Sequence, residues 1–106
     1  MSDAINSKQA TAIEATVGWF SQEMEQVMKR PENLAKGTWD YCSDVYLITK
    51  LKAAVEHVQD NTFELGTDET LLARIKECAD VANIAMMIAS NAFHLLNELE
   101  EEESNV

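Results

Sequence analysis

The sequence predicts an all-α protein, a long-helix bundle with three main helices completed by oligomerisation. Apolar residues recur at alternating steps of three and four along most of the 106-residue chain, which is the period of helices buried along one stripe. One proline and three glycines leave little room for the tight turns of a sheet protein. Because typical domains have about 100–150 residues, we expect residues 1–106 to form one domain.

The first helix is expected over residues 3–29. Its apolar stripe consists of Ile13, Val17, Phe20, Met24 and Val27. Pro31 follows the stripe and marks its end, since proline cannot easily continue a helix. The pattern weakens toward the N-terminus, and we expect about residues 1–8 to fray.

The second helix is expected over residues 39–60, after a connection over residues 31–38. Either Thr38 or Asp40 is placed to cap it. Its apolar face consists of Leu47, Ile48, Leu51, Ala54, Val55 and Val58.

Five residues around this helix have side chains with functional potential. At about 100° per residue, Glu56 and Asp60 fall on the side away from the apolar face and are expected to face solvent. His57 lies at the flank of that face and is either structural or a ligand. In the connection, Trp39 is expected to close the end of the core, and Lys36 is a candidate phosphate contact.

The third helix, expected over residues 67–99 after a connection over residues 61–67, organises the chain. Its stripe consists of Leu71, Ile75, Cys78, Ala82, Ala85, Ala89, Ala92, Leu96 and Leu99. Within this apolar run, Glu77 and Asp80 lie on neighbouring turns of one face. Carboxylates there are costly unless they are paired or hold a cation, so this pair is a candidate site.

The net charge of −11 argues against direct binding to nucleic acid and to anionic membrane surfaces. Much of it lies in an acidic tail expected over about residues 100–106. No apolar run approaches the ~20 residues of a membrane span, and no signal pattern opens the chain. We therefore expect a cytoplasmic protein, with Cys42 and Cys78 as reduced thiols.

Several segments resemble a known family when they are taken in chain order. They are a Lys-Gly-x-Trp connection at residues 36–39, a helix carrying Tyr46-Leu47 and Leu51, and the segment Glu77-x-x-Asp80-Val81-Ala82-Asn83 followed by Ala85-Met86-Met87-Ile88-Ala89. Over roughly residues 20–92, the chain resembles the short phage and bacterial MazG-like nucleoside-triphosphate pyrophosphohydrolases.

The resemblance implies an all-α enzyme that cleaves a nucleoside triphosphate, often a deoxynucleotide, into monophosphate and pyrophosphate. Such enzymes hold Mg²⁺ with a Glu-Glu-x-x-Glu motif on one helix and a Glu-x-x-Asp motif on another. Glu77 and Asp80 match the second motif as metal ligands, and Glu56 is the candidate to complete the site as a catalytic carboxylate. Candidate contacts for the phosphates of the substrate are Lys50, Lys52, Arg74 and Lys76.

The first motif departs from the family pattern. In one register its three glutamate positions are occupied by Ala53, Ala54 and His57, and in the other by Val55, Glu56 and Gln59. Either register keeps at most one carboxylate, so a weakened Mg²⁺ site is expected.

Two functions therefore stay open. One is the pyrophosphohydrolase; the other is a catalytically inactive member of the same fold that acts as an acidic binding or inhibitor protein against a host factor, or that sequesters a nucleotide. We expect either to work in a bacterial or phage-infected cell as a homo-oligomer, a dimer or tetramer. Pairing through the third helix is expected because its far side carries further apolar residues, Val81, Ile84, Ile88 and Leu95.

Overall fold

The computed structural model describes residues 2–60 and 66–104, and in that part of the chain every regular element is a helix. The predicted all-α class is confirmed. The elements are α1 (Ser2–Met28), α2 (Pro31–Leu34), α3 (Asp44–Asp60) and α4 (Asp68–Ser104).

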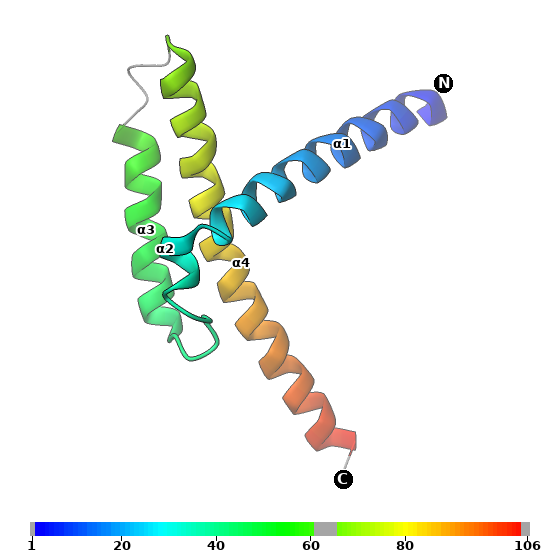
Figure 1. Cartoon of the computed structure of the whole chain (residues 1–106). Coiled ribbons are helices and arrows are strands. Elements are labelled where there is room, and N and C mark those ends of the chain that lie inside the picture. The colour runs from blue at the N-terminus through cyan, green and yellow to red at the C-terminus, as the bar shows by residue number, and fades with distance from the viewer. Residues whose placement is uncertain (1, 61–65, 105–106) are drawn as a thin grey trace.

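The longest helix, α4, is the element on which the others assemble (Figure 1). α3 runs beside the N-terminal half of α4, and the C-terminal end of α1 packs against the middle of α4. α1 then points away from this crossing toward its N-terminus. The C-terminal half of α4 extends on the other side, with no described helix beside it.

The core lies where α1, α3 and α4 meet. One residue from each helix is deeply buried there: Val27 is 4% exposed, Leu47 is 3% exposed and Ala79 is 0% exposed. Asn83 is buried one turn after Ala79, and its Nδ2 donates a hydrogen bond to the Met24 carbonyl, 3.1 Å away. The small side chain of Ala79 lets the backbones approach closely at this crossing.

The boundaries of the outer helices are close to those expected. α1 ends at Met28, and Pro31 then begins the short α2, where proline is favoured because no N–H is needed. At the start of α4, Thr67 is the cap, since its Oγ1 accepts a hydrogen bond from the Thr70 backbone N–H, 3.2 Å away. The acidic residues 100–103 form part of the C-terminal end of α4.

The predicted start of the second helix is wrong. α3 begins at Asp44, because Ser43 caps it through a hydrogen bond from the Tyr46 backbone N–H to Ser43 Oγ, 3.2 Å long. The two expected caps, Thr38 and Asp40, instead bond to each other, since the Thr38 hydroxyl group donates to the Asp40 carboxylate over 2.6 Å. Residues 39–42 consequently form a turn, closed by a hydrogen bond from the Cys42 N–H to the Trp39 carbonyl.

Large apolar side chains remain exposed along α1 and the C-terminal half of α4. The accessible surface is 8340 Å², whereas a compact monomer of this mass exposes about 6,000 Å². The radius of gyration is 17.9 Å, compared with about 13 Å for a compact domain of this length. The most exposed of these side chains in the two regions are Ile13, Val17, Phe93 and Leu95. One chain therefore leaves much apolar surface open.

By length and composition, α4 is also apolar enough over Asp68–Glu103 to cross a membrane. The core helix of a water-soluble protein passes the same test, and the cytoplasmic location stays a prediction.

Candidate functional site

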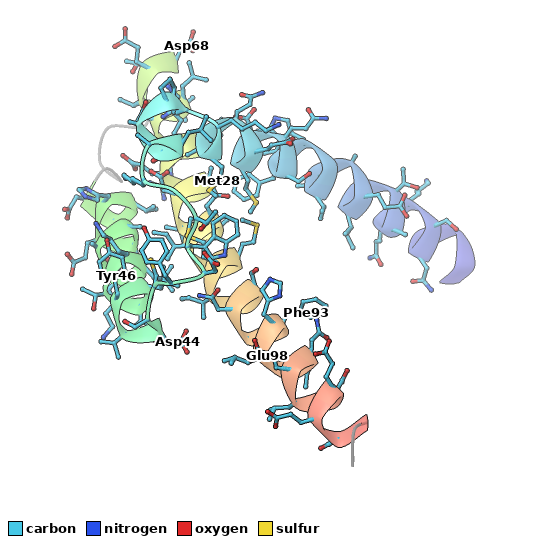
Figure 2. All side chains as sticks on the ribbon, turned by 60° about the horizontal axis from the view of Figure 1, so that its bottom comes forward. Met28, Asp44, Tyr46, Asp68, Phe93 and Glu98 are labelled. Atoms are coloured by element: carbon cyan, nitrogen blue, oxygen red, sulfur yellow. The ribbon has the colours of Figure 1, made fainter. Side chains whose placement is uncertain are left out.

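A cleft of about 690 Å³ opens where α3, the middle of α4 and the connection over residues 35–43 come together. We call it the α3–α4 cleft. Figure 2 labels two of its lining residues, Tyr46 on α3 and Met28 at the end of α1, on two sides of this region. The floor of the cleft is mainly apolar and consists of Val27, Leu47, Ile84 and Met87. It thus lies directly over the core.

The connection forms one wall of the cleft and is held in a defined turn. Gly37 has a φ of 79°, a left-handed conformation that glycine adopts without the strain a side chain would cause. Tyr41 Oη donates a hydrogen bond to the Lys36 carbonyl, 3.1 Å away. These features place Lys36, Trp39 and Tyr41 along one edge of the cleft.

The lining of the cleft has more basic than acidic side chains, although the protein as a whole is strongly acidic. Lys36 and Lys50 line the cleft, and the chain has only eight lysine and arginine residues in all. Lys50 Nζ lies 5.6 Å from the centroid of the Tyr46 ring, within the range of a cation–π contact. His57 also lines the cleft.

Asp80 is the single carboxylate among the lining residues of the cleft. Partial burial raises the pKa of this carboxyl group, and the nearby Glu77 raises it further. Arg30, Lys36 and His57 act in the opposite direction, because their positive charge favours the ionised form. The net effect is a raised pKa, so desolvation outweighs the attraction of the three bases.

The structure brings together part of the predicted site. Lys50 and Asp80 line the cleft, and Glu77 lies one turn before Asp80 and is half-buried. Glu56, Lys52 and Lys76 are exposed and do not line it. Arg74, the fourth candidate base, donates from Nη1 to the Val58 carbonyl over 3.3 Å and so joins α4 to α3.

The structure also distinguishes the two registers of the first metal motif. Ala53, Ala54 and His57 all line the cleft, whereas Val55, Glu56 and Gln59 do not. The positions that face the cleft are therefore those without a carboxylate. Within the described residues, no group of three His, Cys, Asp or Glu side chains converges as a metal site would require.

Three cleft residues escaped the sequence analysis as site candidates: Tyr41, Tyr46 and Asn83. The spacing of Tyr46 and Lys50, one helical turn apart, was a usable signal. Asn83 falls four residues after Ala79 and three before Met86, so it is an amide at a core position of a helix. Polar residues at such positions need a specific partner.

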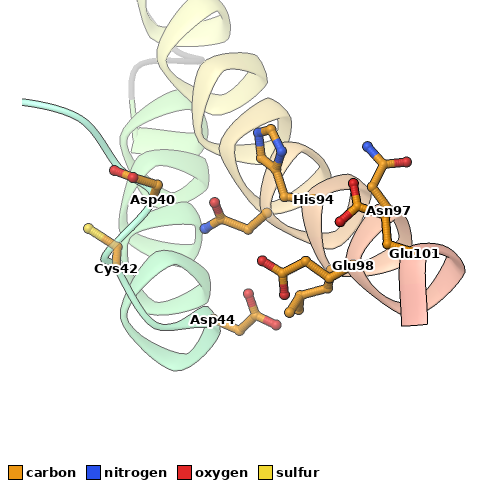
Figure 3. A pocket seen from close by; sticks show the side chains of 9 residues that line it. Asp40, Cys42, Asp44, His94, Asn97, Glu98 and Glu101 are labelled. Atoms are coloured by element: carbon orange, nitrogen blue, oxygen red, sulfur yellow. The ribbon is translucent and has the colours of Figure 1, made fainter. Parts of the chain in front are cut away.

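A second hollow of about 780 Å³ lies between the start of α3 and the C-terminal half of α4. Its lining includes four acidic residues, Asp40, Asp44, Glu98 and Glu101, and we call it the acidic hollow. Figure 3 shows the carboxylates of Asp44 and Glu98 facing each other across it. It contains no lysine or arginine, so the two hollows have opposite character.

Comparisons of the chain with protein-family models, with curated proteins and with solved structures found no match.

Proposed function

We propose that this chain is a MazG-like protein that binds a nucleoside triphosphate, of the deoxynucleotide class, in the α3–α4 cleft. The observation that carries the proposal is the pairing of Lys36 and Lys50 with aromatic side chains at one apolar cleft. Lysines bind phosphate oxygens as point charges, and aromatic rings stack on nucleobases.

In this proposal, the parts of the ligand occupy different parts of the cleft. Lys36 and Lys50 are exposed and lie at the mouth, where the phosphates stay partly hydrated. Trp39 is half-buried at the edge and is the candidate stacking partner for the base. The substitution of the acidic motif positions by Ala53, Ala54 and His57 removes repulsion between the protein and the phosphates.

A binding titration tests this proposal. A nonhydrolysable deoxynucleoside triphosphate is titrated into the protein by calorimetry, first in EDTA and then with Mg²⁺. We expect saturable binding in EDTA, because the lysines contact the phosphates directly. Absence of binding under both conditions would contradict the proposal.

Hydrolysis of the bound nucleotide to monophosphate and pyrophosphate is a second candidate function. Asp80 at the cleft and Glu77 beside it favour it, since carboxylate oxygens are the ligands that Mg²⁺ prefers. Because these two are a partial ligand set, activity requires further oxygens from water or from the nucleotide itself.

The two functions separate in one pair of measurements. Product analysis with Mg²⁺ detects hydrolysis directly, and Asp80→Ala should abolish it while the helical circular dichroism is kept. If the wild type binds nucleotide but forms no pyrophosphate, the chain is a nucleotide-sequestering protein.

We also propose that the chain is a homo-oligomer, a dimer or tetramer that pairs through α4. The excess accessible surface exceeds the roughly 800 Å² that a standard interface takes from each partner. Leu95 and Leu96 in the C-terminal half of α4 are 59% and 52% exposed, which is unusual for leucine beside other apolar residues. Sedimentation at micromolar concentration should show the oligomer, and a sharp monomer would contradict it.

A further inference from the structure

Two helical arms extend from the crossing of α1 and α4 and keep their apolar residues exposed. Every side chain over residues 6–19 of α1 is exposed. Ile13 and Val17 on this α1 arm, and Leu96 and Leu99 on the C-terminal half of α4, are each more than half exposed. Figure 1 shows the two arms diverging from the crossing, so that neither covers the other within one chain.

The α1 arm has a sequence that a solitary helix would hold poorly. It contains Thr11, Thr16, Val17 and Gly18, which are weak helix formers because of their branched side chains or, for glycine, the entropy lost on folding. Isolated helices are marginal in water, and most helical stability in proteins comes from the packing of an apolar face. Since the side chains of this arm are exposed in the single chain, the packing that stabilises the arm must come from outside it.

The exposed faces of the two arms suit each other. The α4 arm presents Ala85, Ala89 and Ala92, all exposed, and their small side chains let another helix approach closely. The α1 arm presents the larger side chains of Ile13 and Val17, spaced by one helical turn. Large residues of one helix can therefore pack between small residues of the other.

The charges of the arms favour α1, and not a second α4, as the neighbour of α4. The end of α4 has five acidic residues, Glu98 and Glu100 to Glu103, whereas residues 6–19 of α1 have one acid and one base, Glu14 and Lys8. Two α4 arms in parallel would bring two acidic clusters together, which is unfavourable. Two α4 arms in the antiparallel direction would separate the clusters but would leave both α1 arms uncovered.

We infer that a second copy of this chain covers both arms, with α1 of each chain packed along the C-terminal half of α4 of its partner. A two-fold axis makes this contact twice, so one kind of pairing covers all four arms. The accessible surface exceeds that of a compact monomer by about 2,300 Å², in the range of about 1,000–2,500 Å² that each chain of an obligate dimer buries. The inference rests on the proposed homo-oligomer and names the element with which α4 pairs.

A membrane is the other environment that covers apolar helices, and the opposite face of the α4 arm argues against it. At about 100° per residue, Asn91, His94, Asn97 and Glu98 lie opposite the alanine stripe, and all four line the acidic hollow. Lipid around the arm would contact this polar face as well, at a considerable cost. A partner helix covers only the apolar stripe and leaves the polar face in water.

The crossing predicts which positions of the two arms meet. Asn83 of α4 bonds to the Met24 carbonyl of α1 there. Val17 lies seven residues before Met24, and Ala89 lies six residues after Asn83, so both are about two helical turns from the crossing. When the crossings of the two chains lie side by side, α1 runs antiparallel to the partner's α4, and Val17 comes close to Ala89 of the partner subunit.

Cysteine cross-linking tests this pairing. In a background with Cys42→Ala and Cys78→Ala, the variants are Val17→Cys, Ala89→Cys and the double variant, each treated with a short bismaleimide. We expect a covalent dimer from the double variant and from neither single variant, because each new thiol then faces the other kind of arm. Sedimentation of the background chain alongside the wild type verifies that removal of the native thiols keeps the assembly.

A charge placed on the α1 arm provides a second, independent measurement. Val17→Lys should weaken the dimer at least about tenfold, since a buried apolar side chain is replaced by a charged one in both symmetric contacts. Leu72→Lys, on the N-terminal half of α4 and also more than half exposed, should leave the dissociation constant of the dimer unchanged. Equal dimer stability in Val17→Lys and the wild type would overturn the inference.

The cross-linking outcomes separate this inference from the proposed oligomer. A covalent dimer from Ala89→Cys alone would show that α4 pairs with α4, and one from Val17→Cys alone would show that α1 pairs with α1. Either result, or a dimer that cross-links in none of the variants, overturns the inference while the oligomer stands. A monomeric wild type overturns both, and binding of that monomer to phosphatidylcholine vesicles would assign the α4 arm to a membrane.

Discussion

The α3–α4 cleft and the acidic hollow are two cavities of similar size with opposite linings. The cleft has Lys36 and Lys50 at its mouth and lies over Val27 and Leu47, two of the three hydrophobic residues that the described chain buries most deeply. The acidic hollow has four carboxylates and none of those three residues in its lining.

The difference indicates which of the two is built to hold a ligand. A cleft over a packed core keeps its lining side chains in fixed positions, because well-packed elements resist displacement. Carboxylates that face one another over water need no ligand, since each stays hydrated. In a chain with a net charge of −11, a lining with two lysines and one carboxylate is the informative feature.

The largest effect is expected from reversing the charge at the mouth of the cleft. The double variant Lys36→Glu, Lys50→Glu should lower nucleotide affinity by more than about a hundredfold, since each lost charge-assisted contact costs about 1.5–3 kcal/mol. Calorimetric titration measures it. Lys52→Glu, Lys76→Glu makes the same change in net charge outside the cleft, and an equal loss in that control would indicate a general electrostatic effect.

The next effect concerns the buried side chain of Leu47 at the floor of the cleft. Leu47→Ala should lower the free energy of unfolding by about 2–5 kcal/mol, because it removes a deeply buried side chain and leaves a cavity. Val45→Ala, also on α3 but 76% exposed, should change it by less than about 0.5 kcal/mol. Urea unfolding measures the free energy of unfolding of both variants. Similar losses in Leu47→Ala and Val45→Ala would mean that Leu47 is not packed in the core.

A smaller effect is expected from the aromatic edge. Trp39→Ala should weaken nucleotide binding by about 1–3 kcal/mol, the usual contribution of a base stacked on an aromatic ring. Trp19→Ala, on α1 and outside the cleft, provides the control in the same titration. Unchanged affinity in Trp39→Ala would remove the stacking role.

The smallest effect concerns Asp80. Its pKa in the folded protein is raised above the ordinary value, so the folded state holds the proton more tightly than the unfolded state. The resulting stabilisation is present at low pH and is lost as the pH rises from the ordinary aspartate pKa through the raised one. At neutral pH the ionised Asp80 carboxylate therefore lowers the stability of the folded state.

Asp80→Asn should accordingly stabilise the free protein at pH 7 and should give no gain at pH 3. The gain at pH 7 should be less than about 0.5 kcal/mol, because the partly buried Asp80 side chain still has much of its surface in contact with solvent. Thermal unfolding at the two pH values measures the difference. A loss of stability at pH 7 would show that the nearby bases affect the pKa of Asp80 more strongly than desolvation does.

Helical periodicity was sufficient to predict the elements but not their assembly into a site. The apolar stripes of α1 and α4 predicted that both are helices. Pro31 and Thr67 predicted the end of α1 and the start of α4, because caps and helix breakers act within a few residues. The start of α3 was missed because two hydroxyl residues competed for the role of cap, and Ser43 prevailed over Thr38.

The cleft depends on contacts between residues distant in sequence, which no local pattern specifies. The sequence offered four equivalent candidate contacts for the phosphates, Lys50, Lys52, Arg74 and Lys76. Only the packing of α3 against α4 places Lys50 at the cleft. Similarly, the partnership of Asn83 with the Met24 carbonyl spans 59 positions. Such pairs follow from the crossing of helices and not from their periodicity.

The most direct test of the central claim uses the two tryptophans of the chain. Trp39 lies at the cleft and Trp19 on α1, so their indole N–H signals in a ¹⁵N-correlated NMR spectrum report two different places, with Trp19→Phe providing the assignment. On addition of dATP in EDTA, we predict that the Trp39 signal shifts saturably while the Trp19 signal stays in place. A saturable shift of Trp19 alone, or no shift of either signal at millimolar nucleotide, would contradict the assignment of the α3–α4 cleft as a nucleotide site.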